Sequence, residues 1–253
     1  MKTMFSKISP VERADYRELI SFVSEAVWPE FMLNSPVSAQ YWDGLFENLA
    51  EYQFALVSQE DQRVVAIANS VPLSWKNSLE ELPDDGWDWA MIKSAMDHAQ
   101  GIQPDLLCGI QISIVPDFQG QGVSKIMLKE ILGLARSKGY PRVIIPVRPS
   151  LKHRYPLTPI DSYLRWTTAE ELPFDPWLRA HVRFGGRIIK PCPSAMEIPG
   201  TITQWEHWTG MRFFESGDYI VPGALVPVQI DVDRDRGTYI EPNVWVVHKV
   251  NHP

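Results

Sequence analysis

The sequence predicts a mixed α/β fold, with a central sheet flanked by helices. Apolar stretches at 54–57 and 64–68 flank a short polar turn, a pattern typical of an antiparallel hairpin. Further along, an apolar strand at 106–115 leads through a glycine-containing turn into an amphipathic helix and then a second apolar strand at 142–148. This order is that of a βαβ unit, so these two strands should be parallel.

Two helices are predicted before the hairpin. Apolar residues recur at intervals of three and four over residues 12–27 and again over 39–49, which gives each segment one face to bury. A short strand at 3–8 is expected to open the chain.

The segment 73–105, between the hairpin and the strand at 106–115, is long for a connection and contains a helical stretch at 89–99. Connections of this length are often functional. We expect its tryptophans to wall a substrate pocket if the segment covers the open side of the sheet; they are Trp75, Trp87 and Trp89.

The C-terminal part is rich in proline. Asp175 as N-cap and Pro176 in the first turn predict a helix at 175–184, which Gly185-Gly186 should end. Strands are expected at 187–190, 225–230 and 243–249, with a short helix at 203–208. Since the sequence contains no repeat or obvious linker, we expect one domain over 1–253 with an insertion at 73–105 and an extended C-terminal segment at 193–253.

The composition of the chain argues against several classes of partner. The net charge of -7 opposes binding to nucleic acid, and no uncharged apolar run approaches the roughly 18 residues that a membrane helix needs. The two cysteines, Cys108 and Cys192, suit a reducing compartment, and the histidines lack metal-site spacing. We therefore expect a cytoplasmic protein without a metal, a membrane anchor or a nucleic-acid partner.

The glycine turn between strand 106–115 and its helix is a candidate phosphate site. A helix N-terminus offers unpaired N–H groups and partial positive charge, and glycines allow a ligand to come close. Lys125 stands where a dinucleotide-binding fingerprint has its third glycine, and no Walker ending follows, which disfavours dinucleotide and nucleoside-triphosphate ligands. A turn that binds nothing is the open alternative. The turn comprises Gln119, Gly120, Gln121, Gly122, Val123 and Ser124.

This turn resembles the acetyl-CoA motif of the GNAT acetyltransferase superfamily, Gln/Arg-x-x-Gly-x-Gly/Ala. Gln119, Gly122 and Ser124 fill its marked positions, with Ser124 departing from the usual glycine or alanine. The order of helices and strands over about 106–190 is also similar to that superfamily. The resemblance implies a GNAT fold, in which a mixed, mostly antiparallel sheet contains a parallel βαβ unit that binds CoA.

For the reaction, the resemblance implies transfer of an acetyl group from acetyl-CoA by direct attack of the acceptor. The backbone of the strand before the turn would pair with the pantetheine arm, and an N–H near Ile114 would polarise the acyl carbonyl. The matching stretch is Ile112, Ser113, Ile114 and Val115. Neither cysteine is needed as a nucleophile, so both are expected to be small buried side chains.

The sequence leaves alternatives for the general acid and the general base of this reaction. His181 falls at the position where many GNAT enzymes carry a tyrosine that protonates the thiolate of CoA; a structural histidine is an equal alternative. Strand 106–115 carries no carboxylate to serve as a base. The residues left for that role are Glu206, Glu215, Asp218, Glu241 and His248.

Two other activities stay open. The C-terminal segment looks like GNAT-like domains of natural-product assembly lines, some of which decarboxylate malonyl-CoA and pass acetyl to a carrier-protein thiol. By that likeness His181, with Ser150 or Thr158, would orient the leaving carboxylate. The other possibility is a CoA-binding module without catalysis. Our main hypothesis is acetylation of an amine on a small molecule or protein, with a homodimer allowed.

A basic cluster after strand 142–148 suits a CoA phosphate or an acidic carrier protein, although a solvated loop would explain it as well. It comprises Arg148, Lys152, His153 and Arg154.

Overall fold

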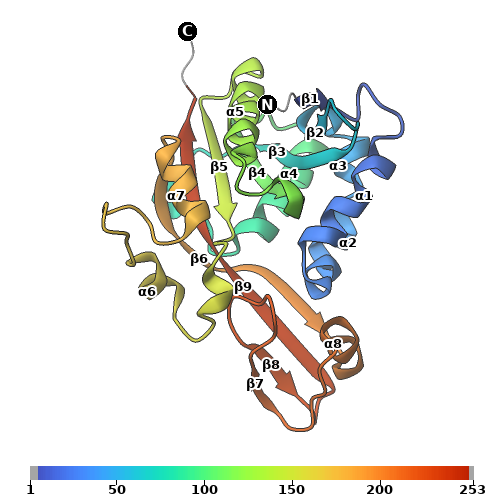
Figure 1. The fold of residues 1–253 in the computed structure, drawn as a ribbon, viewed down its shortest axis with the longest axis vertical. Helices are drawn as coiled ribbons and strands as arrows, with labels where there is room; N and C mark the ends of the chain where they lie inside the picture. The colour runs from blue at the N-terminus through green and yellow to red at the C-terminus, as the bar shows by residue number, and fades with distance from the viewer. Residues whose placement is uncertain (1–4, 251–253) are drawn as a thin grey trace.

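The computed structural model describes residues 5–250, and its strands form one nine-stranded sheet (Figure 1). Along the sheet lie β1 (Phe5–Ile8), β2 (Phe54–Ser58), β3 (Val64–Leu73), β4 (Leu106–Ile114), β5 (Arg142–Val147), β9 (Arg236–Lys249), β8 (Val228–Asp231) and β7 (Gly217–Tyr219), while β6 (Arg187–Gly200) pairs with β9. Within the described residues β4 and β5 are the parallel pair, and the other pairs are antiparallel. The predicted fold class is confirmed.

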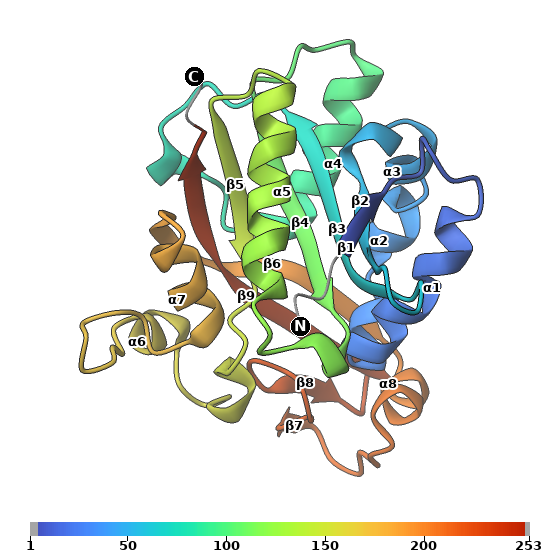
Figure 2. The same cartoon turned by 45° about the horizontal axis from the view of Figure 1, so that its top comes forward.

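Helices cover both faces of this sheet. Figure 2 shows α5 across β4 and β5 on the near face and α4 on the far face. The helix α1 packs beside β3 and β4, α2 lies against α4, and α7 lies against β6. The α-helices are α1 (Tyr16–Val27), α2 (Pro36–Tyr41), α3 (Gly44–Glu47), α4 (Gly86–Ala99), α5 (Val123–Ser137), α6 (Ile160–Leu164), α7 (Pro176–Arg183) and α8 (Ile202–Thr209). Within residues 5–250 no helix combines the length and apolar character needed to cross a membrane.

The single helix predicted at 39–49 is wrong. Ser35 caps α2 by accepting from the backbone N–H of Ser38, and Pro36 stands in its first turn, so this helix begins and ends early. A turn separates it from α3, which opens at Gly44, a poor helix former. The two short helices still bury Leu45 and leave Phe46 partly buried against the core.

Other boundaries moved as well. The first helix begins at Tyr16 rather than at 12, because residues 9–13 form a turn in which Arg13 N–H donates to Ser9 O. The strand predicted at 3–8 is described only as β1, since residues 3 and 4 lie outside the described part. β6 and β9 are each 14 residues long and extend far beyond the predicted stretches.

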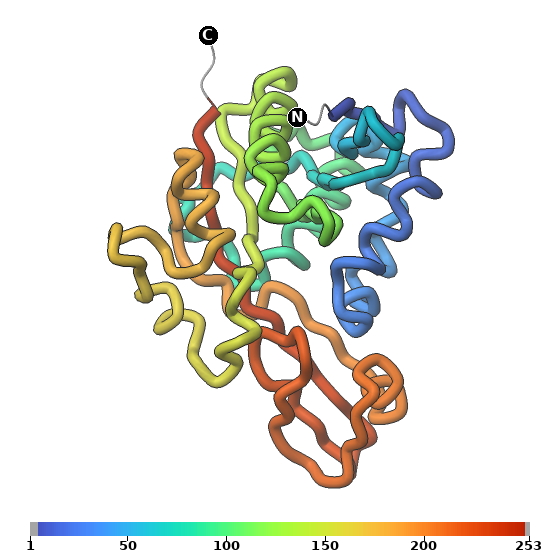
Figure 3. Tube along the Cα trace, in the orientation of Figure 1, coloured from blue at the N-terminus to red at the C-terminus, as the bar shows by residue number. Residues whose placement is uncertain are grey.

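Both strands contain prolines. Because a proline cannot donate a hydrogen bond in a β-ladder, it usually counts against a strand, and the sequence therefore predicted these two strands too short. Their outer halves join β7, β8 and α8 in an extension at one end of the molecule, as the backbone trace in Figure 3 shows. The predicted helix capped by Asp175 is confirmed as α7: the Asp175 side chain accepts from the N–H groups of Trp177 and Leu178.

Candidate active site

The sheet opens between its two parallel strands. The pairing of β4 with β5 joins Leu107 to Val143 and Cys108 to Ile144, and it continues no further. At the next position, a Cβ on Gly109 would lie 3.1 Å from side-chain atoms of Ile131 and Ile145, so only glycine fits there without movement of its neighbours. Beyond Gly109 the facing edges of the two strands are free to pair with an extended ligand.

A β-bulge lies at the start of this opening. Asn69 pairs with Gln111 but Ser70 pairs with Gly109, so Ile110 is the extra residue in β4. The carbonyl of Ile110 accepts a hydrogen bond of 2.8 Å from the indole Nε1–H of Trp87. The strand before the glycine turn therefore contains a bulge, and α4 of the 73–105 segment holds it.

The backbone direction after the bulge follows from the ladder. Val115 N–H donates to Val65 O, and in an antiparallel pair such residues alternate with residues that direct their N–H and C=O groups away. Ser113 therefore pairs toward β3, whereas Ile112 and Ile114 direct their polar groups toward the opening. In agreement, the Ile114 carbonyl accepts from Gln119 Nε2 at 3.0 Å.

The glycine turn lies at the mouth of the opening. Gly120 and Gly122 have φ values of 73° and 80°, which L-residues rarely adopt, and Gly122 is the N-cap of α5. Apart from the adjoining backbone and chain neighbours, no atom lies within 4 Å of a Cβ built on either glycine. The 15-residue helix α5 thus presents its first N–H groups beside open space, as an anion site requires.

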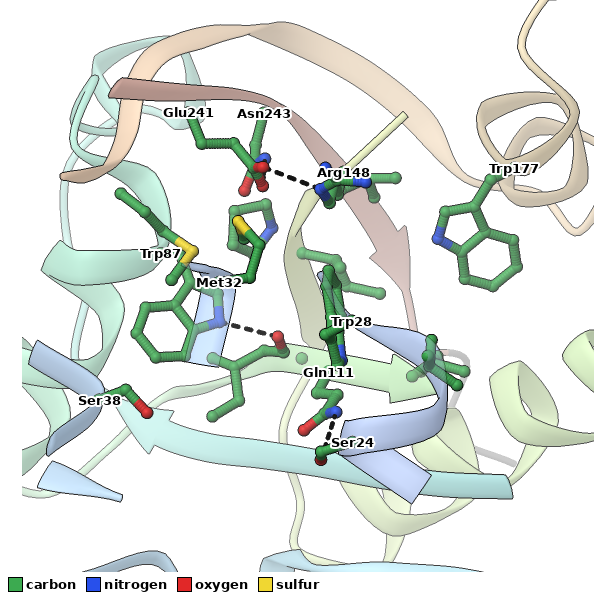
Figure 4. Close-up of a pocket in the computed structure, with 18 of the residues that line it drawn as sticks. Ser24, Trp28, Met32, Ser38, Trp87, Gln111, Arg148, Trp177, Glu241 and Asn243 are labelled. Carbon is green, nitrogen blue, oxygen red and sulfur yellow. Dashed lines mark hydrogen bonds and ion pairs between the residues drawn. The ribbon is translucent and has the colours of Figure 1, made fainter. Parts of the chain in front are cut away.

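A cavity of about 500 Å³ adjoins the opening (Figure 4). β4 contributes residues 109–112 to its wall and β5 contributes residues 145–147. The residues that line it include Ser24, Trp28, Gln111, Arg148, Trp177 and Glu241. Of the predicted CoA-binding stretch, Ile112 and Gln119 line the cavity, and Ser113 lies behind the wall, where it accepts from Trp28 Nε1 at 3.1 Å.

A buried ion pair forms one end of this cavity. Arg148 Nε donates to Oε2 of Glu241 at 2.8 Å, and Arg148 Nη2 donates to the Gly223 carbonyl. Glu241 also accepts from Tyr239 Oη at 3.0 Å and from Asn243 Nδ2 at 3.1 Å. These contacts hold its carboxylate in one orientation although it is only 1% exposed.

The topology explains why Glu241 lines the cavity. β5 pairs with β9 at positions 244–249, and β8 pairs with the same edge only at 236–238. Glu241 lies between these two pairings, where the edge of β9 is open. Of the five residues left as possible bases by the sequence, Glu241 is the one that lines the cavity.

Of the predicted catalytic residues His181, Ser150 and Thr158, only Ser150 lines the cavity. His181 is fully buried, with Nδ1 2.9 Å from Nε2 of His248, and burial holds the pKa of both rings below the usual value, that of His248 at about 4. His181 does not line the cavity, but its ring packs against Trp177, which does, with centroids 4.3 Å apart. Ser150 lines the cavity and Thr158 does not. Their catalytic roles stay predictions.

Only one of the three tryptophans predicted to wall the pocket does so. Trp87 lines the cavity as predicted, but Trp75 and Trp89 do not, because they stack edge-on with each other and Trp89 stacks with Trp245.

Lys152 is not part of a basic docking patch. It is fully buried and donates to the carbonyls of Tyr155 and Leu225, and burial lowers its pKa to about 8.

The cysteines are small buried side chains, as predicted. Cys108 and Cys192 are both inaccessible, and burial raises the pKa of each thiol, so neither is poised as a thiolate nucleophile. Within residues 5–250 no group of three or more histidine, cysteine, aspartate or glutamate side chains is placed to hold a metal ion.

A sheet that splays between two parallel strands, with a bulge at the splay and a glycine turn opening a helix beside it, defines a GNAT-type acyltransferase. Comparison with known proteins agrees. The chain is 32% identical over 252 residues to the arginine N-acetyltransferase avaD of Aspergillus versicolor, covering 89% of this chain and 86% of that protein. No family model matches the chain. The chain belongs to the GNAT N-acetyltransferase family, and its co-substrate is acetyl-CoA.

Solved structures show the same fold. The loading GNATL domain of CurA from Lyngbya majuscula superposes with a TM-score of 0.65 at 17% identity, covering 99% of this chain and all of that one. The GphF GNAT-like decarboxylase, solved in complex with isobutyryl-CoA, gives a TM-score of 0.56 at 14% identity over 98% of this chain and all of that one. The predicted likeness to assembly-line domains is therefore confirmed at the level of the fold.

Proposed function

We propose that the chain transfers acetyl from acetyl-CoA to an amine nitrogen of arginine or a closely related basic amino acid. The observation that carries this proposal is the Arg148–Glu241 pair at the end of a cavity that adjoins the splay. A free amino acid carries its carboxylate and its amine on the same carbon atom. An arginine and a glutamate side by side are complementary to those two groups. The 32% identical arginine N-acetyltransferase supports the choice of a basic amino acid.

On the acetyl-CoA side, the pyrophosphate would bind at the start of α5, on the N–H groups of the turn formed by Gln119, Gly120, Gln121, Gly122, Val123 and Ser124. The pantetheine arm would lie along the free edge of β4, which includes Ile112 and Ile114. The N–H of Ile112, directed toward the opening beside the cavity, is better placed than that of Ile114 to hold the acyl oxygen, since only Ile112 of the two lines the cavity.

On the acceptor side, Glu241 would receive the proton of the attacking amine. Oε2 is already bonded to Arg148 and Tyr239, whereas Oε1 accepts only from Asn243 and keeps a lone pair. The amine nitrogen attacks the acyl carbon, the carbon–sulfur bond breaks, CoA leaves as thiolate and the amine proton passes to the carboxylate. Arg148 retains N–H groups beyond its two bonds, and these can hold the carboxylate of the acceptor.

Release of CoA thiol tests the acceptor class. Acetyl-CoA should be consumed with arginine, and agmatine, which lacks the carboxylate, should react at least about tenfold less efficiently because it forgoes the contact with Arg148. Turnover with aromatic amines and none with any basic amino acid would overturn the proposal.

A second candidate is decarboxylation of malonyl-CoA followed by transfer of acetyl to a carrier-protein thiol. Its support is the near full-length fold likeness to a loading domain and to a GNAT-like decarboxylase, together with a cavity cation, Arg148, that suits a malonyl carboxylate. Ser150 at the cavity wall is available for the same carboxylate, whereas His181 and Thr158 do not reach the cavity wall. Carbon dioxide release from malonyl-CoA would favour this candidate.

Three expectations accompany these proposals. We propose a cytoplasmic setting, supported by two cysteines that form no disulfide. A non-catalytic CoA-binding role would show CoA affinity without turnover in any acceptor screen. A homodimer would be seen by sedimentation.

A further inference from the structure

Gln111, one of the residues that line the cavity, has a buried polar side-chain atom without a partner. It lies on β4 just after the bulge, is 8% exposed and lines the cavity. Its Oε1 is buried and accepts no hydrogen bond in the structure. Five other residues of the described part have a buried side-chain nitrogen or oxygen without a partner, and none of those five lines the cavity.

The amide of Gln111 is held in place by its neighbours. Its Nε2 donates to Ser113 Oγ at 2.9 Å and more weakly to Ser24 Oγ at 3.4 Å. Ser113 Oγ also accepts from the indole of Trp28, which fixes this side of the network. With the nitrogen so occupied, Oε1 is preorganised as an acceptor for a group that the protein itself does not supply.

We propose that Gln111 Oε1 recognises the acceptor substrate by accepting an N–H from the far end of its side chain, and that Gln111 thereby selects a guanidinium-bearing substrate. This inference rests on the proposed function. Figure 4 shows Gln111 and Ser24 toward one end of the drawn cavity and Glu241 with Asn243 toward the other, with Trp28 and Met32 between them.

The two ends match an arginine molecule. The Arg148–Glu241 pair would hold its α-carboxylate and α-amine, its methylenes would lie along the apolar wall that includes Val27, Trp28 and Met32, and its guanidinium would reach Gln111. A buried carbonyl oxygen is a strong partner for a cationic donor because no water competes for it.

Two substitutions at this position test the inference. Gln111→Leu keeps the size and removes the acceptor, and it should raise KM for arginine about tenfold or more while kcat and the KM for acetyl-CoA change little. Gln111→Glu keeps an acceptor and adds charge, so KM for arginine should stay equal or fall. Gln229→Leu, the same change at an exposed glutamine on β8, is the matched control and should have no effect.

Each outcome is decisive. A purely structural role in holding Ser113 and Trp28 would impair Gln111→Leu and Gln111→Glu alike, and that result would overturn the inference while leaving arginine acetylation intact. An unchanged KM in Gln111→Leu would overturn it as well. Wild-type protein that turns over no basic amino acid would refute the proposed function, and the inference with it.

Discussion

Arg148 and Glu241, 93 positions apart in sequence, meet through a hydrogen-bonded ion pair of 2.8 Å at the end of the cavity. The pair joins the end of β5 to the one stretch of β9 that neither β5 nor β8 covers. It supplies the carboxylate that β4 lacks. The base of this enzyme would therefore come from the C-terminal segment and not from the central strand.

The contributions of Arg148 and Glu241 to the free energy of unfolding should be coupled. Arg148→Met leaves a nearly inaccessible carboxylate without its cation, so urea denaturation should show a loss on the order of 3 kcal/mol. The double variant Arg148→Met/Glu241→Met removes both charges and should recover most of that loss. Losses that simply add in the double variant would contradict the coupling.

The glycine turn should be sensitive to any side chain. Gly122→Val places a β-branched residue at φ 80° in the turn where we propose that the pyrophosphate binds, and calorimetry should detect no CoA binding. Gly133→Val, an exposed position within the same helix, should bind CoA like the wild type. Equal affinities of the two variants would show that the turn is not the CoA site.

The role of His181 can be separated from mere packing. If His181 protonates the CoA thiolate, His181→Asn should slow turnover by about 10²-fold or more with CoA affinity unchanged. His98→Asn, on an exposed turn of α4, is the control. A lowered melting temperature with turnover within about threefold of wild type would assign His181 to the core instead.

Stability should decline with acid because the two buried histidines resist protonation. In the unfolded chain they protonate below about pH 6.5, while in the folded protein the pKa of His248 is about 4 and that of His181 is also lowered, by burial. The unfolded state thus binds more protons, so stability is full above pH 6.5 and falls toward pH 4, by up to about 1.4 kcal/mol per pH unit for each histidine.

His248→Gln should flatten that decline in a series of urea denaturations between pH 7 and pH 4, and His98→Gln should leave it unchanged. A slope in His248→Gln as steep as that of the wild type would show that other groups cause the acid sensitivity.

The sequence was most informative where chemistry is local. The βαβ unit, the glycine turn and the helix capped by Asp175 each depend on residues within a few positions of one another, and all were predicted. The motif also led to the family, although it left the acceptor undetermined.

What the sequence could not supply depends on contacts between distant segments. Glu241 was one of five possible bases, and only the end of the β5–β9 pairing distinguishes it. From the sequence, Lys152 looked like part of a basic surface. The carbonyl of Leu225, to which its buried ammonium donates, belongs to the C-terminal segment, and no local pattern connects the two. The unpaired oxygen of Gln111 follows from a bulge and two serines that no local pattern indicates.

The most direct test of the account is the turnover of Glu241→Gln with acetyl-CoA and arginine. Because glutamine cannot accept the amine proton, kcat should fall by about 10²-fold or more while CoA affinity stays that of the wild type. Glu215→Gln, a change at an exposed glutamate, should retain full activity. A Glu241→Gln enzyme with folded structure and kcat within about threefold of wild type would contradict the role of Glu241 as the base.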